Sequence, residues 1–365
     1  MLRKFLSICL LVTTCHLVLA DTAFDDALAK AKSGDAKVQF TLGVMYNEGN
    51  GVPQDYKQAF NWYTKAAEQG HAEAQYNLGL MYTNDTGTPK DTKQAASWIR
   101  KAAEQGHADA QLLLGTMYFL GEGVTQDYTQ AASWTSKAAE QGLAKAQNLL
   151  GMMYNEGKGV QLDREQAVHW YTKAAEQGFA QAQYNLGLMY EKGRGVSQDF
   201  KQSVHWYTKA AEQGVTEAAY KLGIMYGTSL SIGVTQDYKQ SVHWYTKAAE
   251  QGHADAQTGL ASMYEVGQGV TQDYKQALRW YFQAAEQGDV TAQYRLGSMY
   301  RAGQGVTQDF SKAYVWWSLA AANGSPTAME SRGSVESKLT PAMLEKAQQE
   351  AAALMQKIGQ DKAAK

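Results

Sequence analysis

Residues 178–213 read GFAQAQYNLGLMYEKGRGVSQDFKQSVHWYTKAAEQ, and this stretch decides the fold because it recurs along the chain. A glycine opens each copy, and the copies follow one another every 36 residues, apart from one interval of 38. The opening glycines are Gly34, Gly70, Gly106, Gly142, Gly178, Gly214, Gly252 and Gly288, and Gly324 starts a degenerate ninth copy. A fixed period of this length is typical of proteins built from one repeated supersecondary unit. Residues 34–323 are therefore predicted to form eight stacked repeats.

Each repeat reads as two helices. In the copy quoted, Ala182, Leu186 and Met189 follow one another at i, i+4 and i+7, which places them on one face of a first helix. A second helix is predicted to start after Asp199, since an Asp followed three residues later by Gln is a helix-start pattern. The Glu-Gln-Gly that closes each copy supplies the glycine that commonly ends a helix. The pattern predicts an all-α fold of helix-turn-helix repeats.

Comparison of the copies within the chain separates scaffold from surface. Three features are the same in all eight repeats: a leucine and a Met-Tyr pair in the first helix, and a tryptophan in the second. The leucines are Leu42, Leu78, Leu114, Leu150, Leu186, Leu222, Leu260 and Leu296, and the tryptophans are Trp62, Trp98, Trp134, Trp170, Trp206, Trp244, Trp280 and Trp316. Because a single repeat cannot bury its apolar faces alone, residues present in every repeat are expected to serve the stacking contact.

One stripe of the first helix changes from repeat to repeat. Counted from the opening glycine, it occupies positions 4, 8, 11 and 15, which share one helix face. Position 8 reads Thr41, Asn77, Leu113, Leu149, Asn185, Lys221, Gly259 and Arg295, and position 11 reads Val44, Leu80, Thr116, Met152, Leu188, Ile224, Ser262 and Ser298. We call this set of positions the variable stripe, and it is the face on which a partner is expected to bind.

Repeats three to five give the stripe its apolar section. An apolar area with a charged rim is typical of a docking site. The candidate partner-binding residues are Leu113, Leu120, Leu149, Met152 and Leu188, flanked by Lys145, Lys192 and Lys221. The alternative is that these side chains tuck against neighbouring helices and serve packing alone.

The first twenty residues have a composition of their own. Arg3 and Lys4 precede an apolar stretch over residues 5–19, and Val18-Leu19-Ala20 suits a cleavage site, so residues 1–20 are interpreted as a secretory signal peptide. An uncleaved anchor and a lipoprotein site at Cys15 are the alternatives. Both cysteines of the chain, Cys9 and Cys15, lie in this segment, so cleavage would leave no disulfide. We expect an exported protein, periplasmic or secreted, with no membrane span in its mature part.

No motif assigns chemistry to the chain. The formal net charge of −2 and the absence of Lys/Arg runs argue against nucleic acid as a partner. Nucleophile, phosphate-binding and zinc-protease motifs are missing, so no catalytic or cofactor-binding residue is predicted. His169, His205 and His243 recur at one position, but stacked helices lie about 10 Å apart and zinc ligands about 2 Å from the metal, so no metal site is expected. His71, His107 and His253 are interpreted as exposed loop residues.

The two ends are predicted to cover the stack. Residues 21–33 are expected to form a short capping helix, and residues 324–365 a degenerate repeat followed by a C-terminal capping helix that starts at Thr340-Pro341. Terminal elements of this kind cover the last apolar faces of a repeat array.

The repeated A-x-A-Q-x-x-L-G-x-M-Y and W-Y-x-K-A-A-E-Q motifs resemble the Sel-one-like repeat family, relatives of the tetratricopeptide repeats. The resemblance covers residues 34–323 and implies a right-handed α/α superhelix, or solenoid, whose first helices line the concave face. It also implies a bacterial scaffold or adaptor that binds protein partners and is not an enzyme. A regulator of a cell-envelope enzyme, or a host-interaction factor that uses the same groove, is the alternative. The cysteine-rich branch of the family is not matched, because the repeats here have no cysteine.

Overall fold

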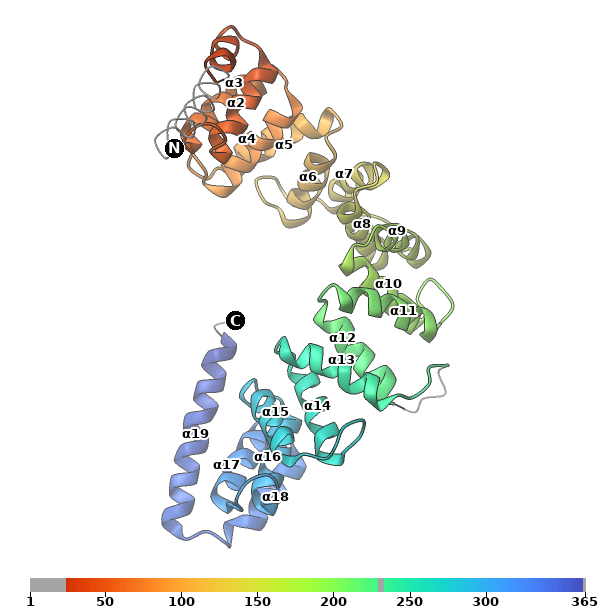
Figure 1. The fold of residues 1–365 in the computed structure, drawn as a ribbon, viewed down its shortest axis with the longest axis vertical. Helices are drawn as coiled ribbons and strands as arrows, with labels where there is room; N and C mark the ends of the chain where they lie inside the picture. Colours follow the sequence, from red (N-terminus) through yellow and green to blue (C-terminus); the bar gives the residue numbers. More distant parts are fainter. Residues whose placement is uncertain (1–23, 229–232, 364–365) are drawn as a thin grey trace, which may run out of the picture. The chain divides into compact units, whose positions relative to one another are not determined.

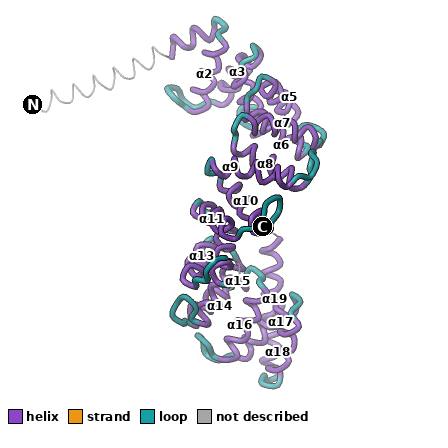
Figure 2. The backbone as a smooth tube through the Cα atoms, turned by 90° about the vertical axis from the view of Figure 1, so that its right-hand side faces the viewer, coloured by secondary structure: helices purple, strands orange, loops and turns teal. Residues whose placement is uncertain are grey.

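A computed structural model describes residues 24–228 and 233–363, without the side chains of 361–363. The regular structure in these residues is entirely α-helical, with short loops between the helices (Figure 2). The chain divides into two compact units, Met1–Phe179 and Ala180–Lys365. The proposed signal peptide, residues 1–20, lies outside the described residues.

The first unit holds a short helix over residues 24–32 and four helix pairs (Figure 1). We call the first helix of each pair the A helix and the second the B helix. The A helices are α2 (Ala36–Glu48), α4 (Ala72–Asn84), α6 (Ala108–Leu120) and α8 (Ala144–Glu156). The B helices are α3 (Tyr56–Glu68), α5 (Thr92–Glu104), α7 (Tyr128–Glu140) and α9 (Arg164–Glu176).

The second unit holds four further pairs and two terminal helices (Figure 1). The A helices are α10 (Ala180–Lys192), α12 (Thr216–Gly227), α14 (Ala254–Val266) and α16 (Val290–Ala302). The B helices are α11 (Phe200–Glu212), α13 (Tyr238–Glu250), α15 (Tyr274–Glu286) and α17 (Phe310–Ala322). The terminal helices are α18 (Pro326–Glu336) and α19 (Pro341–Ala363). The eight helix pairs confirm the predicted all-α repeat fold.

An aspartate starts every B helix, as the sequence pattern predicts. The carboxylate of Asp55 accepts hydrogen bonds from the backbone N–H groups of Lys57 at 2.9 Å and Gln58 at 3.1 Å. These N–H groups have no partner inside the helix, so the side chain stabilises the first turn. In α17 the aspartate, Asp309, accepts from Lys312.

The core is made by the residues that are the same in every repeat. The invariant leucines are 0–1% exposed. Trp62, Trp244, Trp280 and Trp316 are buried, and the remaining invariant tryptophans are half-buried. A tyrosine of the B helix lies directly over a glycine of the A helix in several repeats, and a Cβ on Gly187 would lie 2.7 Å from the ring of Tyr207. The glycine therefore lets the two helices of a repeat approach closely.

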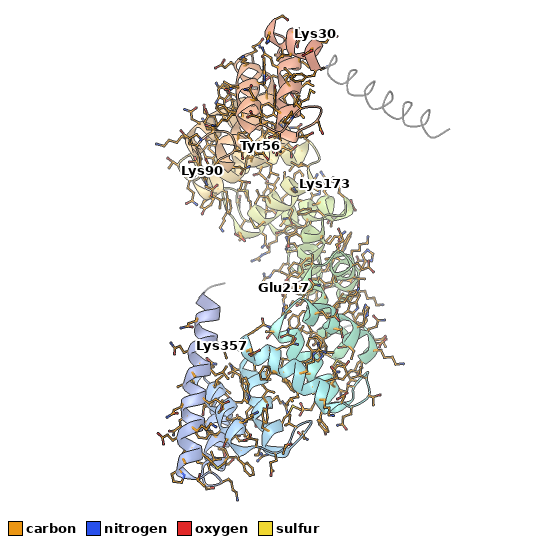
Figure 3. The ribbon with its side chains drawn as sticks, turned by 60° about the vertical axis from the view of Figure 1, so that its left-hand side comes forward. Lys30, Tyr56, Lys90, Lys173, Glu217 and Lys357 are labelled. Carbon is orange, nitrogen blue, oxygen red and sulfur yellow. The ribbon has the colours of Figure 1, made fainter. Side chains whose placement is uncertain are left out.

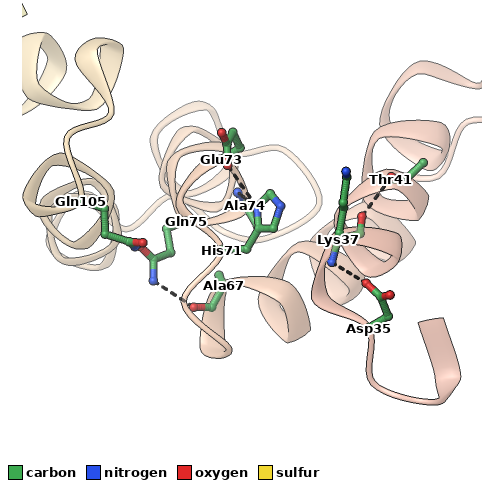
Figure 4. Close-up of polar contacts among 9 residues, drawn as sticks. All are labelled: Asp35, Lys37, Thr41, Ala67, His71, Glu73, Ala74, Gln75 and Gln105. Atoms are coloured by element: carbon green, nitrogen blue, oxygen red, sulfur yellow. Dashed lines mark hydrogen bonds and ion pairs between the residues drawn. The ribbon is translucent and has the colours of Figure 1, made fainter. Parts of the chain in front are cut away.

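Buried glutamines tie successive helices together (Figure 4). The Nε2 of Gln75 donates to the carbonyl of Ala67 at 3.0 Å, and its Oε1 accepts from Nε2 of Gln105 at 2.7 Å. The same pair of bonds recurs at Gln39, Gln111, Gln147, Gln257 and Gln293, where Asn323 is the donor to the last. In the sixth repeat Ala219 occupies this position, and Gln251 instead accepts from the hydroxyl of Thr216. Each bond pair satisfies buried polar groups across a repeat boundary.

The C-terminal helix covers the end of the second unit. α19 packs against α17 (Figure 1), and the backbone N–H of Met343 donates to the hydroxyl of Thr340, the expected cap. Lys357 lies on α19 (Figure 3). Its ammonium nitrogen lies 3.4 Å from a carboxylate oxygen of Glu286, at the end of α15. No helix in the described part of the chain has the length and apolarity needed to cross a membrane.

Candidate partner-binding face

The variable stripe lies beside the buried face of each A helix and remains partly open to solvent. Leu114, one of the invariant leucines, is completely buried, whereas its neighbour Leu113 in the stripe is half-buried. The same contrast separates Leu150 from Leu149. Adjacent leucines therefore have different environments: Leu114 lies inside the core, whereas Leu113 packs on the edge of the core and keeps part of its side chain open to solvent.

The first unit holds four of the predicted apolar residues and one of the lysines. Leu113, Leu149 and Met152 are half-buried, and Leu120, at the end of α6, is 55% exposed. Lys145 is exposed and forms no ion pair within the described residues.

Phe119 extends the apolar section of the first unit, and sequence reasoning missed it. Its ring is half-buried and meets Tyr128 edge-on at 5.2 Å between centroids, with the ammonium of Lys158 at 5.3 Å from the ring. Phe119 occupies position 14, next to the stripe positions, and the residue there also differs between repeats. That variation was the signal that could have found it.

The second unit holds the remaining predicted residues, Leu188, Lys192 and Lys221, and its two lysines form ion pairs. Leu188 is half-buried. The ammonium groups of Lys192 and Lys221 both contact the carboxylate of Glu191, at 2.7 and 3.4 Å. Both positive charges are therefore paired with one acid, Glu191, which the sequence pattern did not indicate.

Glu191 is the centre of a polar cluster. Burial alone would raise the pKa of Glu191. The pKa nevertheless lies below the ordinary glutamate value, because Lys192 and Tyr207 donate hydrogen bonds to the carboxylate and Lys221 adds a nearby positive charge. The hydroxyl of Tyr207 donates to Glu191 at 2.6 Å, and burial, followed by this bond, raises the tyrosine pKa. Glu191 is thus held ionised, and Tyr207 is held protonated.

The same arrangement occurs once more in the second unit. Glu265 accepts from the hydroxyl of Tyr281 at 2.7 Å and lies 3.8 Å from the guanidinium of Arg295. In both clusters the acid is at position 14 of one repeat and the base at position 8 of the next. The residue pair at these two positions therefore sets the local chemistry of the face at a repeat junction.

The two sets of recurring histidines differ in burial and in the groups that they contact. His169, His205 and His243 are exposed and meet the neighbouring tryptophan edge-on, at 4.9–5.2 Å between ring centroids. The described residues contain no group of three or more His, Cys, Asp or Glu side chains placed to hold a metal ion.

The interpretation of the other histidines as exposed loop residues is wrong. His71, His107 and His253 are half-buried helix caps. The Nδ1 of His107 accepts from the backbone N–H of Ala110, and its ring stacks on Tyr76 of the preceding repeat at 4.6 Å. Histidine is an uncommon N-cap, so the sequence pattern did not indicate this role.

Comparison with known proteins agrees with this architecture. The Sel1 repeat family model matches eight consecutive segments, residues 36–71, 72–107, 108–143, 144–179, 180–215, 216–253, 254–289 and 290–325. The comparison with curated proteins gave no match.

Two solved structures cover most of the chain. A Sel1 repeat protein from Oxalobacter formigenes is 38% identical, with 86% of this chain and 91% of that chain covered and a TM-score of 0.66. A protective antigen present in uropathogenic Escherichia coli strains, which displays the same repeat fold, is 34% identical, with 93% of this chain and 88% of that chain covered and a TM-score of 0.52. The chain therefore belongs to the Sel1 repeat family, whose helical repeats generally serve as scaffolds for protein–protein interaction.

Proposed function

We propose that this protein is an exported scaffold or adaptor that binds protein partners along the variable stripe, the face expected to be concave. The observation that carries the proposal is the partial exposure of Leu113, Leu149 and Met152 beside fully buried neighbours. Apolar side chains left partly open to solvent, here on α6 and α8, gain free energy when a partner covers them. Leu120 and Phe119 enlarge that area in the first unit.

The second unit offers a different surface for a partner. Its section of the stripe carries Leu188 beside the Glu191 cluster, where acid and base are both present. Charged groups at the rim of an interface influence specificity and association rate more than affinity. We assign the main apolar contact to the first unit and a selective contact to the second.

Export and a second candidate function are each supported by one observation. Residues 1–20 have the charge and apolar pattern of a signal peptide. The similar structure from uropathogenic E. coli is described as a protective antigen, and a role at the host interface is therefore the second candidate function. Fractionation of cells that express a C-terminally tagged chain tests export, since retention of an unprocessed chain in the cytoplasm would contradict it.

The binding proposal is tested with the double substitution Leu113→Ser and Leu149→Ser. Leu162→Ser is the matched control, because Leu162 is 50% exposed in a loop outside the stripe. We expect the double variant to lose proteins captured by the wild type from envelope extract, while the control keeps them and circular dichroism stays unchanged for both. Unchanged capture by a folded double variant would reject the proposal. An activity assay of the captured partner, with and without this protein, separates a regulator from a scaffold.

A further inference from the structure

A hollow of about 160 Å³ opens on the variable stripe of the first two repeats. Its polar lining includes Asn47 of α2 and Asn77 and Asn84 of α4, and its apolar lining includes Leu80 and Met81. Asn77, Leu80 and Asn84 occupy positions 8, 11 and 15, so this hollow and the apolar section of repeats three and four belong to the same face of the same unit.

The three asparagine side chains have no hydrogen-bond partner in the described part of the chain. Contacts at Asn47 and Asn84 use their backbone carbonyls, which accept from Gln54 and from the hydroxyl of Thr86. Asn47 and Asn77 are half-buried, and their side chains line the hollow. Asn155, which occupies the position of Asn47 in the fourth repeat, has a buried carbonyl oxygen without a partner within the described residues.

The lining of the hollow is uncharged. Tyr63 closes one side, and burial, with a smaller effect of Glu48, raises the pKa of Tyr63 to about 12, so its hydroxyl keeps its proton at neutral pH. A charged ligand group would lose hydration here without gaining an opposite charge. The chemistry therefore suits a neutral ligand that both donates and accepts hydrogen bonds.

A side-chain amide offers one acceptor oxygen and two donor hydrogens, which match the carbonyl and N–H groups of a peptide bond. A helical peptide uses these groups within its own helix, whereas an extended peptide leaves them free. Leu80 and Met81 provide an apolar contact for a side chain next to the amides. A sugar would use the amides too, but it would gain little from the leucines that continue along the stripe at Leu113 and Leu149.

We propose that Asn47, Asn77 and Asn84 form an amide clamp that holds the backbone of an extended, uncharged peptide segment of a protein partner. The proposal rests on the function proposed above, since it assumes that the variable stripe meets a protein. An extended chain advances about 3.3–3.6 Å per residue, so twelve residues span up to about 40 Å, or three helix widths of about 10–12 Å. A segment of about twelve residues can therefore reach from the clamp to Leu113 and Leu149.

The test uses a displayed library of random 12-residue peptides selected on the purified full chain. Selected peptides are synthesised with a fluorophore, and their dissociation constants are measured by fluorescence anisotropy. The test variant is Asn47→Ala with Asn77→Ala, and the matched control is Asn61→Ala, since Asn61 is exposed on α3 outside the stripe. We expect at least about tenfold weaker binding to the test variant and unchanged binding to the control.

Backbone recognition is tested on the peptide itself. N-methylation of single peptide bonds should weaken binding to the wild type at one or two positions, and the same methyl groups should have little further effect on the Asn47→Ala, Asn77→Ala variant. Equal affinity of every selected peptide for wild type and test variant would overturn the clamp. So would asparagine-dependent binding of a chitin tetrasaccharide in the absence of any asparagine-dependent peptide.

The Leu113→Ser, Leu149→Ser variant distinguishes a failure of the amide clamp from a failure of the proposed scaffold function. Peptides that lose affinity for the Leu113→Ser, Leu149→Ser chain but not for the asparagine variant would contradict the clamp and leave the scaffold function intact. Peptides that depend on the asparagines but not on the leucines would support the clamp and contradict the apolar contact.

Discussion

Gln75 and Gln105 share a 2.7 Å hydrogen bond between their side-chain amides, although they lie 30 residues apart in sequence. Gln75 is 4% exposed and also donates to the carbonyl of Ala67 at the end of the preceding B helix. One glutamine therefore connects the end of α3, the start of α4 and the end of α5 (Figure 4).

Replacement of Gln75 by Ala is expected to lower the free energy of unfolding by about 1–3 kcal/mol, because it leaves a buried carbonyl and a side-chain amide without partners. Urea unfolding followed by circular dichroism measures the loss. Gln94→Ala is the control, since Gln94 is exposed on α5. Equal stability of both variants would show that solvent replaces the lost bonds.

Leu113 and Leu114 provide a test of which side chains belong to the core. Leu114 is completely buried, so Leu114→Ala should lower the free energy of unfolding by about 2–5 kcal/mol, whereas Leu113→Ala should cost about 1 kcal/mol or less. Urea unfolding of the two variants measures both losses in the free energy of unfolding. Similar losses would mean that Leu113 serves packing and would weaken its assignment to a docking face.

Glu191 is expected to make stability depend on pH. Its pKa is lower in the folded chain than in the unfolded chain, so its contribution is present above the unfolded glutamate pKa and is lost as pH falls through the folded value. Glu191→Gln should therefore reduce the free energy of unfolding by about 1 kcal/mol at pH 7 and by less below about pH 4. Unfolding of both proteins at the two pH values measures the difference, and a loss that stays constant with pH would contradict the assignment.

Alanine substitutions at Gly70 and Gly123 distinguish the energetic cost of backbone strain from that of a steric clash. Both have positive φ, 92° and 68°, but a Cβ on Gly70 meets nothing within 4 Å, whereas a Cβ on Gly123 would collide with the backbone carbonyl of Thr92. Gly70→Ala should cost about 1 kcal/mol, and Gly123→Ala about 2–4 kcal/mol. Thermal or urea unfolding of the two variants gives both values. Equal costs would show that the loop after α6 moves away from α5 without penalty.

The helices and their stacking could be predicted because the same sequence pattern recurs in every repeat. Asp199 and Asp55 mark helix starts through a local hydrogen bond, and the invariant leucines mark the core through periodicity. Such signals depend on neighbours close in sequence or on the repeat period, and both can be read from one chain.

The candidate site was only partly predictable. The positions of the stripe followed from variation between repeats, but the pairing of Lys192 and Lys221 with Glu191 depends on how one repeat packs on the next. The buried glutamines were missed for a different reason. Gln75 and Gln105 recur in nearly every repeat, so their roles were open to the same comparison, but a polar residue near a helix end also suits a solvent-exposed cap.

The alanine at position 219 changes what holds the fifth and sixth repeats together. The amide tie found at other boundaries is missing here, and the contact between Glu191 and Lys221 spans the same boundary. Attraction between charges that are partly open to solvent weakens as ionic strength rises, whereas a buried hydrogen bond from a glutamine amide to a backbone carbonyl of the preceding repeat is less sensitive to salt. The boundary between the fifth and sixth repeats should therefore weaken more with rising ionic strength than a boundary such as that between the first and second repeats, which a buried glutamine bridges.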